Sequence, residues 1–149
     1  MPKLDLDAIE RNNNTGYPPP YDQPMAKRHV RRLSPIMGLV DFGASQVMLE
    51  PGGISSQRHW HEEEDELVVM LEGEAVLVEE GSEAVMRPGD VAVFPKGVAN
   101  GHHLVNRSAQ PCTFLAIGRA AAGNCHYPDI DLKVDGRTLA YTHRDGTPY

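Results

Sequence analysis

The chain has 149 residues, the length of one domain, and 40% of them are hydrophobic, as expected for a domain that buries a core. Its formal net charge is −7, most of which comes from the acidic run 62–66, and no broad basic face is evident, so nucleic-acid binding is not expected. No apolar run approaches the roughly 18 residues of a membrane span, and two cysteines cannot form a disulfide framework. We therefore expect a cytoplasmic protein with reduced thiols and no membrane partner.

Residues 1–26 contain five of the twelve prolines, three of them consecutive at 18–20. Proline lacks a backbone donor and fixes φ, so this stretch predicts a proline-rich N-terminal arm rather than a helix or a central strand. Such an arm can lie on its own domain or on a partner subunit, and the sequence leaves both open. We interpret the basic run 27–32 as an edge strand protected by charge, with contact to a phosphate or carboxylate as the alternative.

Between residues 27 and 118, turn signals containing Gly, Pro or Asn recur at short intervals, with short runs rich in Val, Leu, Met and Phe between them. This spacing predicts an all-β fold, a single-domain β-barrel or jelly-roll sandwich, with helix confined to short turns. Residues 119–149 form a polar C-terminal extension, in which Asp135-Gly136 between two apolar segments predicts a hairpin.

His59 and His61 are two residues apart, and on a strand such residues point to the same face, with Trp60 on the opposite side. After the acidic turn 62–65, which we interpret as hydrated, Glu66 begins the next strand, and its carboxylate can rejoin the two imidazoles. Imidazole and carboxylate groups gathered in this way suit a divalent metal ion such as Zn, Fe, Mn, Ni or Co.

His102 and His103 compete to supply a further ligand. On a strand, His102 and Leu104 share one face and His103 takes the other. If Leu104 packs into the barrel, His102 does as well, so we expect His102 to be the ligand and His103 to face solvent or bond to the backbone. Cys125-His126 resembles half of a metal site, but no second half lies nearby in the sequence, and we interpret it as incidental.

These segments resemble the two signature motifs of the cupin superfamily (RmlC-like proteins). The first motif is Gly, five residues, His-x-His, three or four residues, Glu, six residues and Gly; its positions are matched by Gly53, His59, His61, Glu66 and Gly73. The second is Gly, five residues, Pro-x-Gly, two residues, His, three residues and Asn; its counterparts are Gly89, Pro95, Gly97, His102 and Asn106. Four residues instead of two precede the His of the second motif, so this loop is longer than the pattern.

The resemblance implies a single-domain cupin barrel over residues 27–118. The metal ligands that it implies are His59, His61, Glu66 and His102. Asp65 is the alternative carboxylate ligand, although the six-residue distance to Gly73 favours Glu66. The tail 126–149 and the segment 16–22 are similar to those of small bacterial single-domain cupins, which are commonly homodimers.

Three neutral imidazoles and one carboxylate leave a divalent ion with a net charge of about +1 and one or two open positions. Such an ion polarises a carbonyl or enol oxygen, lowers the pKa of bound water, or binds O₂ if it is redox-active. The small-molecule ligand would be rich in oxygen, such as a sugar derivative or a hydroxy- or keto-acid. We therefore expect a metal-dependent isomerase, lyase or dioxygenase. A non-catalytic protein that binds a small ligand or senses a metal is the alternative.

Overall fold

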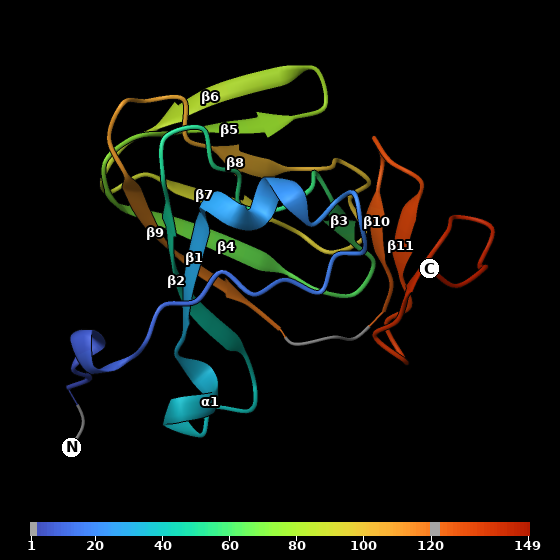
Figure 1. The fold of residues 1–149 in the computed structure, drawn as a ribbon, viewed down its shortest axis with the longest axis horizontal. Helices are drawn as coiled ribbons and strands as arrows, with labels where there is room; N and C mark the ends of the chain where they lie inside the picture. The colour runs from blue at the N-terminus through green and yellow to red at the C-terminus, as the bar shows by residue number, and fades with distance from the viewer. Residues whose placement is uncertain (1–2, 120–122) are drawn as a thin grey trace.

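Short antiparallel strands make up most of the regular structure in the computed structural model, which describes residues 3–119 and 123–149 (Figure 1). The strands are β1 Arg28–Arg32, β2 Gly43–Leu49, β3 Trp60–His61, β4 Glu66–Glu72, β5 Ala75–Glu79, β6 Ser82–Met86, β7 Val91–Phe94, β8 His103–Val105, β9 Cys112–Gly118, β10 Cys125–Tyr127, β11 Leu132–Val134 and β12 Tyr141–Thr142. The helical elements are the short helix α1 Ser34–Met37 and the 3₁₀ turns η1 Leu6–Ala8 and η2 Gln23–Lys27. The prediction of an all-β fold is confirmed.

Two sheets enclose the main core. One has the strand order β1-β2-β9-β4-β7 and the other the order β6-β5-β8; Figure 1 shows β5, β6 and β8 together on one side of the larger sheet. Buried side chains from both sheets pack into one cluster, which includes Leu49, Met70 and Phe114 from the first and Leu77 and Leu104 from the second. The alternation of buried and exposed residues along these strands fixes which face of each sheet turns inward.

The proline-rich arm lies on its own domain. The backbone N–H and carbonyl groups of Asn12 exchange hydrogen bonds with those of Val30, at 3.1 and 2.8 Å. Strand β1 is the edge of its sheet, as the basic run predicted, and the arm covers that edge. Further along the arm, Tyr17 and Met25 pack into a second small core with residues of β10 and β11. The arm therefore ties the first strand to the C-terminal extension.

The C-terminal extension forms a sheet of order β12-β11-β10-β3, at the right of Figure 1. Strands β11 and β12 form a hairpin in which Val134 pairs with Tyr141, and the Asp135 carboxylate accepts hydrogen bonds from two backbone N–H groups of the turn. Strand β10 pairs with β3, with Cys125 opposite His61. The extension is thus joined to the strand that carries His61. Within the described residues, no helix has the length and apolar character needed to cross a membrane.

Asn106 is fully buried and joins neighbouring backbone segments. Its amide donates hydrogen bonds to the carbonyls of Leu49 and Gln110, at 3.0 and 2.8 Å. Its Oδ1 accepts from the backbone N–H and the hydroxyl of Ser108, at 2.9 and 2.8 Å. The last position of the second motif therefore stabilises the strand ends around it.

Replacing Asn106 with Ala should lower the free energy of unfolding by about 2–3 kcal/mol, because the buried carbonyl of Leu49 loses its side-chain donor. Urea denaturation measures the change. Asn13→Ala is the matched control, since the Asn13 amide makes one exposed hydrogen bond of 3.4 Å; its effect should stay within about 0.5 kcal/mol. Equal effects of the two substitutions would contradict the structural role of Asn106.

Candidate metal centre

The barrel brings the two histidine segments side by side. His59 and His102 form an antiparallel bridge, with N–O distances of 3.2 and 2.9 Å between their backbones. His61 lies in β3, and Glu66 is the first residue of β4, where it pairs with Phe94 on one side and Gly118 on the other. Three segments of backbone therefore hold the side chains that the sequence singled out: one with His59 and His61, one with Glu66 and one with His102.

The three imidazoles surround one oxygen of Glu66. Its Oε2 lies 2.9 Å from Nε2 of His102, 3.4 Å from Nε2 of His61 and 3.5 Å from Nε2 of His59. All four predicted side chains are thus brought together, with one nitrogen of each ring within 3.5 Å of the same carboxylate oxygen. Such convergence of three nitrogens and one carboxylate matches the donor set that divalent first-row metals take in proteins.

The charges of this cluster are strongly coupled. Burial raises the pKa of the Glu66 carboxyl, but hydrogen bonds from His102 and His59 outweigh burial and bring this pKa well below its usual range. Burial lowers the pKa of His59, yet the adjacent Glu66 carboxylate raises it above 6.5. Burial dominates at His61 and lowers its pKa to about 4. The carboxylate is therefore ionised and attracts positive charge to this point.

The surroundings of the imidazoles fit a metal as well. His59 Nδ1 lies 3.0 Å from the Gln57 carbonyl, which fixes a proton on Nδ1, so Nε2 is the nitrogen that a metal can displace a proton from and bind. The His102 ring stacks on Phe94, with ring centroids 3.5 Å apart and planes 1° apart. His102 Nδ1 is buried and has no hydrogen-bond partner among the described residues. The rings of His59 and His102 are thus oriented by neighbours other than Glu66.

His103 lies differently from His102. Its Nδ1 donates a hydrogen bond to the Ser56 carbonyl at 2.9 Å, while Leu104 is buried in the main core beside His102. His102 and Leu104 are therefore both buried, as the alternation of side chains along a strand predicted. The two extra residues in the loop before His102 do not change which of the two histidines turns inward. Asp65, the alternative carboxylate, accepts a hydrogen bond from the Lys96 backbone N–H at 2.9 Å.

The prediction that residues 62–65 form a hydrated turn is wrong at Glu64. Its side chain is only 16% exposed, and Oε2 lies 3.5 Å from Nδ1 of His61. Burial, reinforced by the charge of Glu66, raises the pKa of Glu64 to about 7. Glu64 shares strand parity with Glu66, and this was the signal that could have shown its inward direction. Glu64 contacts Nδ1 of His61, whereas Glu66 lies near Nε2, so Glu64 can orient the ring from the nitrogen that does not face Glu66.

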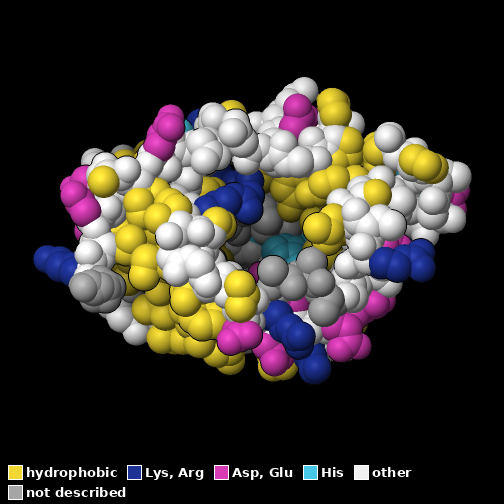
Figure 2. Space-filling view, turned by 90° about the horizontal axis from the view of Figure 1, so that it is seen from below, with side chains coloured by type: hydrophobic (Ala, Val, Ile, Leu, Met, Phe, Trp, Pro, Cys, Tyr) yellow, Lys and Arg dark blue, Asp and Glu magenta, His cyan; other side chains and the backbone are white. Residues whose placement is uncertain are grey.

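A cavity of about 240 Å³ opens over this cluster. Figure 2 shows it as a hollow with histidine atoms at its floor and Lys or Arg atoms at its edge. Its walls include Val30, Val47, Val68 and Phe114. An apolar chamber with convergent polar groups at one end is the usual form of a small-molecule site.

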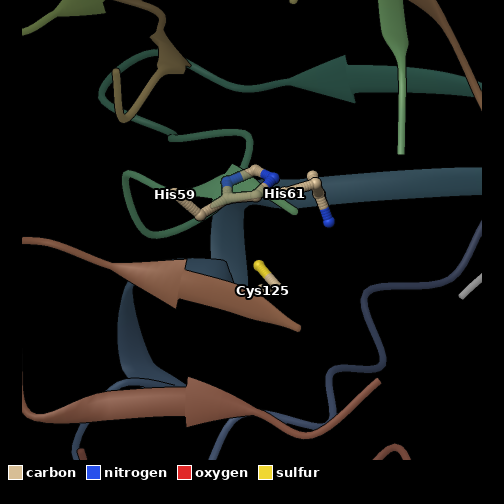
Figure 3. Close-up of side chains that lie close together, drawn as sticks. All are labelled: His59, His61 and Cys125. Carbon is tan, nitrogen blue, oxygen red and sulfur yellow. The ribbon is translucent and has the colours of Figure 1, made fainter. Parts of the chain in front are cut away.

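Cys125 also lies against the histidines, so the interpretation of Cys125-His126 as incidental is wrong for Cys125 (Figure 3). Its sulfur and one nitrogen each of His59 and His61 lie within 4.8 Å of one another. Burial raises the pKa of the Cys125 thiol to about 12, so the free group is protonated at neutral pH. The pairing of β10 with β3 brings it there, and no spacing in the sequence indicates that pairing.

Two neighbours of the histidines contact other groups. The amide of Gln57 donates a hydrogen bond to the Tyr21 carbonyl at 3.1 Å. Trp60 stacks on His126, with ring centroids 4.4 Å apart. These two residues pair across β3 and β10 next to the pair of His61 and Cys125, so they lie on the opposite face of the sheet, as the alternation predicted.

Among the solved structures that resemble this protein, some match nearly the whole chain and others only part of it. A sugar phosphate isomerase of the cupin superfamily from Silicibacter pomeroyi is 46% identical, with 99% of this chain and 96% of that chain covered and a TM-score of 0.92. The family model described as Cupin domain matches residues 45–118. The chain belongs to the cupin superfamily. The comparison with curated sequences gave no match.

Other solved structures share the cupin fold at lower identity. A candidate sugar phosphate isomerase from Acidithiobacillus ferrooxidans is 27% identical, with 77% of this chain and 74% of that chain covered and a TM-score of 0.71. A polyketide cyclase from Streptomyces resistomycificus is 21% identical, with 79% and 78% covered and a TM-score of 0.65. The second of these shows the fold alone. The predicted cupin barrel is confirmed.

In the metal-free cupin, Glu66→Gln should lower the pKa of His59 to below 6.5. The carboxylate raises this pKa against burial, and without its charge burial is the largest remaining effect, opposed by the hydrogen bond to the Gln57 carbonyl and the charge of Glu64. Titration of the imidazole by NMR after treatment with a chelator measures the shift. Glu62→Gln serves as the control, because Glu62 pairs with His126 instead and its loss should leave His59 unchanged. A His59 pKa that stays above 6.5 in Glu66→Gln would show that another group carries the effect.

Proposed function

We propose that this cupin binds one divalent metal ion through His59, His61, Glu66 and His102, and that the bound ion acts on a small oxygen-rich molecule. The observation that carries the proposal is the convergence of three Nε2 atoms on one oxygen of Glu66, within 2.9–3.5 Å. Zn, Fe, Mn, Ni and Co all accept these donors. The four side chains leave part of the coordination sphere to a ligand in the cavity.

The residues of the site have separable tasks. When bound, the metal would supply Lewis acidity, polarising a carbonyl or hydroxyl oxygen of the substrate. The Gln57 carbonyl keeps His59 in the tautomer that can ligate, and Glu64 orients His61. The apolar walls at Val47 and Phe114 limit the access of water to the substrate.

We favour a metal-dependent enzyme, an isomerase, lyase or dioxygenase, over a protein that only binds a ligand or senses a metal. The name of the Silicibacter pomeroyi protein, a sugar phosphate isomerase, supports this choice at 46% identity. Incubating the metal-loaded cupin with aldose and ketose phosphates, and following them by NMR, separates the two functions. Turnover supports an isomerase; saturable binding without turnover supports the binding protein.

Wild-type cupin should bind close to one equivalent of metal, and His59→Ala and His102→Ala should each lose tight binding. His103→Ala should keep it, because the His103 ring, unlike those of His59 and His102, is not among the side chains gathered around the Glu66 carboxylate. Elemental analysis after dialysis against metal buffers measures the content. If only His103→Ala empties the site, the second motif has a different ligand; if none of these substitutions does, the proposed site fails.

We also infer a homodimer, formed through the β7 edge of the larger sheet. The arm covers the β1 edge of its own domain, so the other edge is the candidate. Within the described residues β7 pairs only with β4, and its Val91 and Val93 are 55% and 61% exposed. An exposed apolar edge strand favours pairing with a second copy.

Sedimentation at micromolar concentrations should therefore give a dimer, and Val93→Lys should shift it toward monomer by adding a charge to the edge. Leu139→Lys is the control, because Leu139 is also apolar and 59% exposed but lies in the turn between β11 and β12, outside the sheet that contains β7. A monomeric wild-type protein, or equal effects of the two substitutions, would contradict the proposed interface.

A further inference from the structure

Strand β1 directs three side chains into the cavity beside the candidate metal ligands. Arg28, Val30 and Arg32 alternate along the strand and all three line the cavity. The intervening residues face the other way and have acidic partners: His29 contacts Glu50 at 2.7 Å, and Arg31 contacts an aspartate on the arm at 3.2 Å. The two faces of the strand therefore differ in how their positive charges are balanced.

The arginines on the inner face have no acidic partner. Among residues 3–119 and 123–149, no carboxylate oxygen lies within 4.0 Å of the guanidinium of Arg28 or Arg32. Arg58, by contrast, contacts Glu80 and Asp129 at 2.9 and 2.6 Å.

Arg28 is the more enclosed of the two. Its Nη1 donates a hydrogen bond to the Ser55 carbonyl at 2.9 Å, while Nε is buried and has no partner among the described residues. Burial lowers the pKa of its guanidinium, and the nearby charge of Arg32 adds to that effect. A buried cation with an unused donor is costly unless an anion approaches it.

Within the described lining, Glu66 is the acidic side chain of this cavity, and three imidazoles already surround its oxygen. A divalent ion would leave that end with a net positive charge of about +1. The end of the cavity at the metal and the end at Arg28 and Arg32 would then both carry positive charge, and the walls between them are largely apolar. A neutral sugar would leave the guanidiniums unmatched.

We infer that the inner face of β1 binds the anionic group of the cavity's ligand through Arg28 and Arg32, and that this ligand is a small carboxylic acid or phosphate monoester. The inference rests on the proposed metal-centred function for the other end of the ligand. Guanidinium groups bind carboxylate and phosphate oxygens in pairs. The volume of about 240 Å³ limits the ligand to the size of a small metabolite.

The test uses inorganic phosphate and malonate as probes in isothermal titration calorimetry at fixed ionic strength, with metal-loaded and metal-free protein. Arg28→Gln and Arg32→Gln should each weaken binding of at least one probe by about tenfold or more. Arg31→Gln is the matched control, with the same charge change on the outer face of the same strand, and should change the affinity less than twofold. The probe bound more tightly identifies the anion as phosphate or carboxylate.

Several results would overturn the inference: no binding of either probe to wild type at 10 mM, no loss in Arg28→Gln or Arg32→Gln, or an equal loss in Arg31→Gln. If Arg28→Gln does not fold, as judged by circular dichroism, Arg32→Gln and Arg28→Lys decide; the Lys variant keeps the charge and loses the paired donors. Metal content is measured on the same samples. Anion binding that needs the arginines in protein unable to hold metal would support the inference while the proposed metal function fails.

Discussion

A single buried carboxylate sets the requirements for the rest of this molecule. Glu66 is largely buried at the start of β4, with 25% of its side chain exposed, and a buried anion is tolerated only with positive charge and hydrogen-bond donors around it. Three imidazole nitrogens supply these at 2.9–3.5 Å. The same balance is met by a divalent ion at that point, so the arrangement that keeps the folded protein stable is also one that suits a metal.

Antiparallel pairing provides the precision that this cluster needs. Glu66 lies between Phe94 and Gly118 on neighbouring strands, and the backbone bridge between His59 and His102 fixes the other two segments. The absence of a side chain at Gly118 matters as well, because a Cβ there would lie 2.5 Å from Oε1 of Glu64. A small residue on one strand therefore allows a carboxylate on the adjacent turn to reach the cluster.

The sequence predicts the features that depend on neighbouring residues, and it misses those that depend on contacts between distant segments. The alternation of side chains along single strands is local, and it correctly predicts the inward direction of His59, His61 and His102 and the charged edge at β1. Cys125 reaches the histidines only because β10 pairs with β3, a contact between distant segments that no spacing indicates. Glu64 is misjudged because composition suggests a hydrated acidic run, whereas the fold buries one member of it. Whether the arm covers its own domain depends on Asn12 and Val30, which likewise meet only in three dimensions.

Two parts of the chain form the site: the segment that matches the cupin domain, and the segments that flank it. The segment that matches the cupin domain, residues 45–118, holds the four side chains around the proposed metal position. Strand β1 and the C-terminal extension lie outside it, yet they contribute Arg28, Arg32 and Cys125 to the same region. Metal binding would need side chains from residues 45–118 alone, since the donors of one ion must be close together. Recognition of the remainder of a ligand needs groups farther from the metal, and we propose that Arg28 and Arg32, on the flanking strand β1, supply them. Differences in these flanking segments can therefore change the ligand while the metal donors stay the same.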